Sequence, residues 1–147
     1  MKKNAKIRKS RKRKSPTDKA MAELAKLCRL VVLKRDGRCI LKYLVPLKNG
    51  CSDVRQADHM IPVSIGNVLT RFELRNLNEL CSSHNMLKQM NPLCTVELAR
   101  WVDKQYGDGT YEDIKEMSRR RDTEAMKPNL ERIESKIAEC KEFLGEL

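Results

Sequence analysis

The sequence contains no long apolar run and few aromatic residues. No stretch approaches the roughly 20 apolar residues that a helix needs to cross a bilayer, and the basic N-terminus is not followed by the apolar segment of a secretory signal. We therefore expect a cytoplasmic protein without a membrane partner. Aromatic residues make up only 4% of the chain, so base stacking on an aromatic platform, the usual mode of single-strand recognition, has little support.

Basic residues outnumber acidic ones by 31 to 20, which gives a formal charge of +11. Such a charge favours a polyanionic partner, and DNA is the partner that we expect. Nine lysines and arginines fall within residues 1–14, where almost nothing is apolar. We predict that 1–15 is a disordered arm, either gripping DNA phosphates or serving as a solubilising tail. The predicted phosphate contacts are Lys2, Lys3, Lys6, Arg8, Lys9, Arg11, Lys12, Arg13 and Lys14.

The remaining 16–147 fit one domain of the α+β class, mostly helical. Ser15-Pro16 is typical of a helix start, and apolar residues at three- and four-residue spacing predict a helix to about Arg35, where Asp36-Gly37 ends it. The other expected elements are strands at 38–41, 54–61 and 76–80, a loop at 62–70, a helix from 81 to before Pro92, and helices at 95–106, 110–121 and from 127 onward. The regular last helix is expected to pack against the domain, or against a second copy in a homodimer.

The stretch from Asp58 to Lys88 carries the residues that suit chemistry. Asp58 is a hard oxygen ligand for a divalent ion, and His59 is of the residue type that exchanges protons near neutral pH. Asn76 and Asn85 follow on a second extended segment and on a helix. A strand, a loop and a helix could bring these four side chains together around one ion. The alternative is a capped turn with ordinary loop asparagines.

This stretch resembles the HNH nuclease family. The matching residues are Asp58-His59-Met60-Ile61-Pro62, Asn76-Leu77-Asn78-Glu79-Leu80-Cys81 and His84-Asn85-Met86-Leu87-Lys88. The resemblance implies a small ββα-metal (His-Me finger) unit, with its core motif at 38–91, embedded in a domain whose C-terminal part, 95–147, is helical. It also implies that the protein is a hydrolase, an endonuclease that cleaves phosphodiester bonds with Mg²⁺ or Mn²⁺.

The resemblance also implies a role for each residue of the motif. His59 would be the general base and Asn76 would position it, by holding the loop backbone or the imidazole. Asp58 would hold the catalytic ion. The family's last histidine is replaced by Asn85, an HNN variant, so either Asn85 or the adjacent His84 would be the second ligand. Lys88 is expected to contact DNA.

A second metal site is indicated by cysteine spacing. Cytoplasmic cysteines are more often metal ligands or buried residues than disulfides. Many HNH proteins carry two Cys-x-x-Cys knuckles; here one reads Cys81-x-x-His84, and the other has only Cys39, with Lys42 in the place of its partner. Cys51 could complete a Cys3His zinc site. The alternative is that these cysteines are small core residues without zinc.

The order of elements along 17–147 is similar to that of phage NinG (Rap) recombination proteins. This likeness implies nicking of branched DNA, such as D-loops or Holliday junctions, in a bacterial host cell. Two alternatives remain open from the sequence: a sequence-tolerant HNH nicking or homing-type nuclease, and a catalytically inactive DNA-binding module of the same fold.

Overall fold

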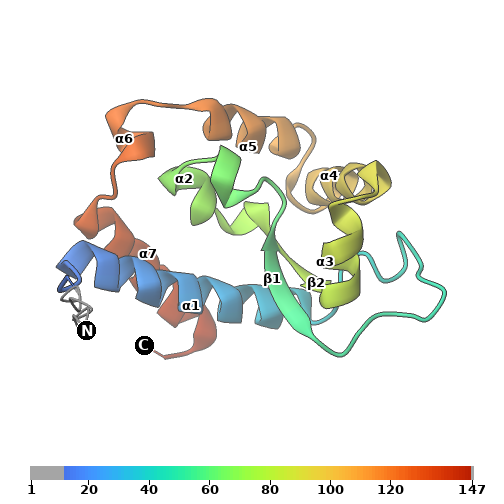
Figure 1. Cartoon of the computed structure of the whole chain (residues 1–147). Coiled ribbons are helices and arrows are strands. Elements are labelled where there is room, and N and C mark those ends of the chain that lie inside the picture. Colours follow the sequence, from blue (N-terminus) through green and yellow to red (C-terminus); the bar gives the residue numbers. More distant parts are fainter. Residues whose placement is uncertain (1–11, 147) are drawn as a thin grey trace, which may run out of the picture.

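The computed structural model describes residues 12–146, an α+β fold of helices around a two-stranded sheet (Figure 1). The α-helices are α1 (Pro16–Asp36), α2 (Val68–Arg71), α3 (Ser82–Lys88), α4 (Pro92–Tyr106), α5 (Thr110–Arg119), α6 (Thr123–Met126) and α7 (Leu130–Leu144). The strands are β1 (Arg55–His59) and β2 (Leu77–Cys81), and the 3₁₀ turns are η1 (Val63–Ile65) and η2 (Leu74–Asn76). Within the described part of the chain, no helix combines the length and apolarity needed to cross a bilayer.

The first helix begins and ends where its sequence signals predict. The Ser15 hydroxyl accepts a bond from the Asp18 N–H while the Asp18 carboxylate accepts one from the Ser15 N–H, so two N-terminal donors are satisfied. Gly37 closes the helix at φ 70°, a left-handed conformation that glycine adopts without a Cβ penalty. The predicted helix to about Arg35 is confirmed.

The two strands pair antiparallel, and their register fixes which side chains share a face. Arg55 lies opposite Cys81, Asp58 opposite Asn78 and His59 opposite Leu77. Since directly opposed residues project to the same face, Asp58 and Asn78 lie on one side of the sheet. In Figure 1 the hairpin lies between α1 and α3, and both helices contact β1.

Each face of the hairpin covers a separate apolar core. On one side α1 and α7 pack together, with Leu24, Val32 and Ile133 buried. On the other side Leu80 packs with residues of α4 and α5, such as Leu98. The apolar face of α7 is thus used within the chain. Phe143 remains 47% exposed on α7, and a homodimer through this helix stays a prediction.

Several boundaries differ from the sequence prediction; for example, the last helix begins at Leu130, after the short α6, rather than at 127. Residues 38–41 form a turn rather than a strand, because Ile40 makes a single ladder-like bond, to the Glu79 carbonyl, before the chain folds back. The predicted loop at 62–70 contains η1 and the start of α2. The fourth helix begins at Pro92, capped by the Asn91 side chain, not at 95.

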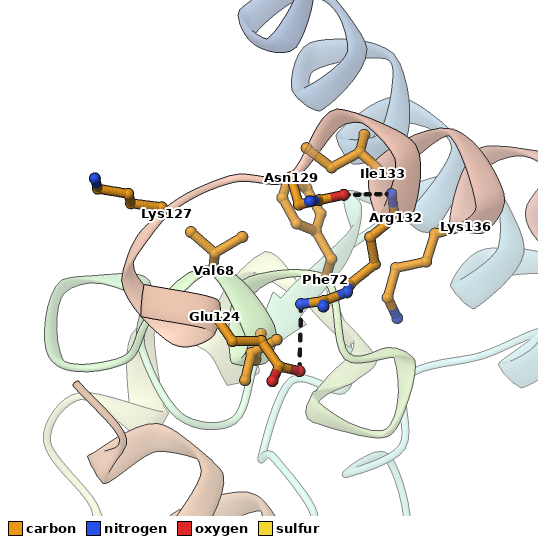
Figure 2. Close-up of a pocket in the computed structure, with 9 residues that line it drawn as sticks. Val68, Phe72, Glu124, Lys127, Asn129, Arg132, Ile133 and Lys136 are labelled. Carbon is orange, nitrogen blue, oxygen red and sulfur yellow. Dashed lines mark hydrogen bonds and ion pairs between the residues drawn. The ribbon is translucent and has the colours of Figure 1, made fainter. Parts of the chain in front are cut away.

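A small cavity lies where the link from α6 to α7 crosses α2 (Figure 2). Its volume is about 20 Å³, room for no more than about one water molecule. Arg132 extends from α7 to within 3.3 Å of the Glu124 carboxylate, and its own N–H is capped by Asn129 (Figure 2). This ion pair connects α7 to α6. The cavity itself is too small for a small-molecule ligand.

Arg35 joins the end of α1 to the segment that leads into β2. Its guanidinium donates to the Asp36 carboxylate at 2.7 and 3.0 Å, to the Leu74 carbonyl at 2.9 Å and to the Leu77 carbonyl at 2.6 Å. Asp36, whose side chain is 2% exposed, also accepts the Glu79 N–H at 2.9 Å. Removal of the guanidinium would leave a buried carboxylate without its counter-ion.

We therefore expect Arg35→Met to lower the free energy of unfolding by about 3 kcal/mol, as for other buried pairs that lose one partner. Urea unfolding followed by circular dichroism measures the change. Arg119→Met is the matched control, because Arg119 pairs with Glu116 on the exposed face of α5, where such a pair contributes about 0.5 kcal/mol. Equal effects of the two substitutions would contradict a stabilising role for the Arg35 network.

Candidate metal centre and candidate active site

Three cysteines and a histidine meet at one end of the hairpin, as the sequence predicted. The His84 Nδ1 lies 3.2 Å from the Cys81 sulfur, 3.3 Å from Cys39 and 3.5 Å from Cys51. All four donor atoms lie within 4.8 Å of one another. Bond lengths of about 2.3 Å to sulfur and about 2.0 Å to nitrogen make the S···N edge of a zinc tetrahedron about 3.5 Å. The Cys3His cluster can therefore hold a metal ion such as zinc.

Hydrogen bonds prepare the cluster for a cation. The His84 Nε2–H donates to the Val45 carbonyl at 2.6 Å, which leaves Nδ1 as the unprotonated nitrogen that faces the sulfurs. Burial raises the pKa of Cys81, but hydrogen bonds to its sulfur, first of them from the His84 backbone N–H, outweigh burial and lower that pKa to about 6. Burial raises the pKa of Cys39 to about 12. Cys81 is thus the thiol most ready to be a thiolate.

Local structure brings the four ligands together. Cys81 ends β2 and caps α3, so its sulfur accepts the His84 N–H one turn later. Cys39 follows Gly37 at the end of α1. Cys51 is held near α3 by its neighbour Ser52, whose hydroxyl bonds the Ser82 hydroxyl at 2.6 Å. The segment 37–54 has no helix or strand of its own, so these two cysteines close an otherwise irregular loop.

A second polar site lies at the other end of the hairpin. Asp58 projects toward α3, where its carboxylate bonds the Lys88 ammonium; Lys88 also donates to the His59 carbonyl at 2.8 Å. One turn earlier on α3, the Asn85 Nδ2 donates to the Gln56 Oε1 at 2.8 Å, which leaves the Asn85 carbonyl oxygen free as an acceptor. The oxygens on this face are carboxylate and amide oxygens, the ligands that Mg²⁺ and Mn²⁺ prefer.

The geometry distinguishes between His84 and Asn85, the two candidates for the second ligand of the catalytic ion. His84 lies in the Cys3His cluster beside Cys81, and Cys81 pairs with Arg55, three residues from Asp58. At about 3.4 Å per strand residue, the two sites are roughly 10 Å apart. His84 therefore does not reach an ion at Asp58, whereas Asn85 faces β1.

His59 leaves β1 on the opposite face from Asp58, as consecutive strand residues do. The His59 Nε2–H donates to the Arg71 carbonyl at 2.8 Å. This bond fixes the tautomer and leaves Nδ1 as a proton acceptor. The imidazole lines a hollow of about 180 Å³ that Arg29 and Arg71 also line. His59 is half-buried, not enclosed.

Asn76 is buried and holds the loop that follows β1. Its amide oxygen accepts the Ile61 N–H at 2.8 Å, and its Nδ2 donates to the Ile61 and Thr70 carbonyls, both at 3.1 Å. Every side-chain bond of Asn76 thus goes to loop backbone. The structure does not bring the four predicted side chains together around one ion: the Asn76 amide bonds loop backbone, and His59 leaves β1 on the opposite face from Asp58. Asn76 was expected to hold either the loop backbone or the His59 imidazole, and its hydrogen bonds go to the loop backbone.

Sequence reasoning missed Asn78. Its side chain is fully buried directly opposite Asp58, and neither its Nδ2 nor its Oδ1 finds a hydrogen-bond partner within residues 12–146. A buried amide without partners costs stability unless a water or an ion satisfies it. The alternation of β2 could have indicated its position beside Asp58, had the register been known.

The predicted DNA contacts fall into three groups. Lys12, Arg13 and Lys14 are exposed. Lys2, Lys3, Lys6, Arg8, Lys9 and Arg11 lie outside the described residues. Lys88 is 11% exposed and bonds Asp58, so it is not an open phosphate contact in this arrangement.

Comparison of the chain with protein-family models, curated proteins and solved structures finds no match. The geometry of the two sites is therefore what supports a function.

Proposed function

We propose that the protein is a metal-dependent endonuclease of the HNH type that cleaves phosphodiester bonds in DNA. The proposal rests on the hydrogen bonding of the His59 imidazole. Its imidazole is oriented by the Arg71 carbonyl, retains one nitrogen to accept a proton, and directly follows Asp58 in the sequence at the end of β1. A general base needs both an orienting bond and a free nitrogen.

Each part of the hairpin then has a role. Asp58 and the Asn85 amide oxygen are the residues that would hold Mg²⁺ or Mn²⁺ at the end of β1. The ion would supply charge stabilisation for the scissile phosphate and the leaving oxygen. His59 would take the proton from the attacking water, and Asn76 keeps the following loop in the shape that presents His59. The Cys3His cluster would hold zinc and fix the start of α3.

The surroundings of His59 suit a phosphate. Arg29 from α1 and Arg71 from α2 line the same hollow of about 180 Å³ as the imidazole, and guanidinium groups bind phosphate oxygens in a fork geometry. The net charge of +11 favours the approach of a nucleic acid. Branched DNA of the recombination type is the substrate that we propose, with linear duplex as the alternative.

Nicking of a four-way junction and of its linear duplex, each with Mg²⁺ and with Mn²⁺, tests the proposal. We expect nicking that requires the added ion and is faster on the junction. Asp58→Asn should lose nicking and keep DNA binding, because the amide cannot supply the ligand charge. Glu139→Gln is the matched control: Glu139 is exposed on α7, and neither of the two sites described above includes it. Ion-independent nicking, or full activity of Asp58→Asn, would refute the assignment.

One contact favours a binding module without cleavage. The Lys88 ammonium bonds the Asp58 carboxylate, in the position where a catalytic ion would compete with it. In that reading Lys88 replaces the ion permanently, and the protein binds branched DNA without cutting it. Junction binding with no nicking under either ion would select this alternative.

A further inference from the structure

An open groove lies between α4 and the segment 37–54, which carries the cluster ligands Cys39 and Cys51. It consists of two adjoining hollows, of about 340 and 330 Å³, which share Arg38, Ile40, Trp101 and Gln105. One wall comes from the end of α1 and the turn after Cys39, and the other comes from α4. No residue of β1, β2 or α3 and none of the four cluster ligands lines it, although Arg38 and Ile40 flank the ligand Cys39 in the sequence.

Aromatic residues are concentrated in this groove. The chain has one tryptophan, three tyrosines and two phenylalanines; the tryptophan and two of the tyrosines line these hollows. The rings of Trp101 and Tyr106 meet edge to face, with centroids 6.5 Å apart. Tyr43 is 65% exposed. The scarcity of aromatics counted against a stacking platform, but three of the six aromatic side chains lie in this one groove.

The groove is also positively charged. The guanidinium of Arg38 lies 4.8 Å and the ammonium of Lys42 5.3 Å from the centroid of the Tyr43 ring. Both acids in the lining are already paired, Glu97 with Arg100 and Asp36 with Arg35. Within residues 12–146, neither Arg38, Lys42 nor Lys104 has an ion-pair partner. The groove therefore carries a net positive charge.

Open aromatic rings beside unpaired cations match the chemistry of single-stranded nucleic acid. Bases stack on the rings irrespective of sequence, and the phosphates follow the cations. A duplex keeps its bases stacked inside and would use only the cations. An acidic peptide would use the cations and gain little from exposed tyrosine. The combination favours a strand with unpaired bases.

We propose that this groove, formed by Arg38, Tyr43, Trp101, Lys104 and Tyr106, binds a segment of single-stranded nucleic acid, with a base stacked on Tyr43 or Trp101. The proposal does not depend on the proposed hydrolysis. A protein that never cleaves DNA could use the groove, and a nuclease could lack it.

Trp101 provides a direct readout, because it is the only tryptophan in the chain. Binding of a dT oligonucleotide of about 12 nucleotides, without added Mg²⁺ so that the probe is not cut, should quench its fluorescence. Tyr43→Ala should weaken this binding by about tenfold, the usual loss when one stacking side chain is removed. The logarithm of the affinity should fall with that of the salt concentration, by about 0.7 per phosphate contacted.

Phe143→Ala is the matched control. Phe143 is 47% exposed on α7 and lies under the Lys34 ammonium at 5.3 Å, so it is a ring–cation pair outside the groove. It should leave oligonucleotide affinity unchanged, and both variants should unfold at the wild-type temperature within a few degrees. The proposal is overturned if the oligonucleotide does not quench Trp101, if Tyr43→Ala binds as tightly as the wild type, or if polyglutamate or the matching duplex quenches equally well.

Discussion

Replacing Cys81 with serine is expected to remove bound zinc and most of the stability of the fold. Cys81 is the ligand with the lowered pKa, and it also caps α3 through the His84 N–H. Its loss would open the cluster that closes the segment 37–54. We expect the free energy of unfolding to fall by more than about 4 kcal/mol, a size typical of losing a structural metal, out of the 5–15 kcal/mol usual for a domain.

Zinc content per chain, measured with a chromogenic chelator, and urea unfolding check this expectation. We expect one zinc per wild-type chain and none in Cys81→Ser. Cys94→Ser is the matched control, since Cys94 is fully buried in the same core but is not one of the four ligands. It should keep its zinc and lose about 1–3 kcal/mol from burial of a hydroxyl. A wild-type chain without zinc, or equal zinc content in the two variants, would contradict the assignment of Cys81 as a zinc ligand.

Substitution of His59 should have the largest effect on the proposed cleavage. Removal of a general base typically slows a reaction by about 10²–10⁴-fold, and we expect that loss of nicking rate in His59→Ala. Binding of the four-way junction should remain, because the arginines around the imidazole are unchanged. The hollow beside His59 has a volume of about 180 Å³, so added imidazole should restore part of the rate.

His59→Gln separates proton transfer from positioning. The glutamine Nε2–H can donate to the Arg71 carbonyl in place of the imidazole Nε2–H, so the loop should keep its structure, but an amide cannot accept the proton. We expect the wild-type unfolding temperature and the activity of His59→Ala. A nicking rate within tenfold of wild type in either variant would exclude His59 as the base.

Local signals in the sequence predicted the elements that local interactions determine. The capping residues around Ser15 and the glycine at 37 set the limits of α1, and the spacing of the cysteines predicted the Cys3His cluster. The prediction of a helix at 95–106 places the start of α4 too late, although Asn91-Pro92 carries the same kind of signal as Ser15-Pro16.

The features that were not predicted depend on contacts between distant segments. The turn at 38–41 is shaped by the cluster that Cys39 joins, not by the strand preference of its residues. Asn78 lies opposite Asp58 because of the register between the two strands, which the sequence does not specify. The groove brings Tyr43 beside Trp101, more than fifty positions along the chain, and no sequence pattern links the two.

The loop between Cys39 and Cys51 has a consequence for the evolution of this surface. Its interior is anchored at Leu41 and Val45, which are buried, and by the Val45 carbonyl that orients His84. Residues 46–50 lie between that anchor and Cys51 and form no part of the core. Because closing a longer loop costs little extra entropy, this stretch can be lengthened or rewritten while the scaffold stays the same. New contacts could thus be introduced in residues 46–50 without replacing the buried Leu41 and Val45 or the ligand Cys51.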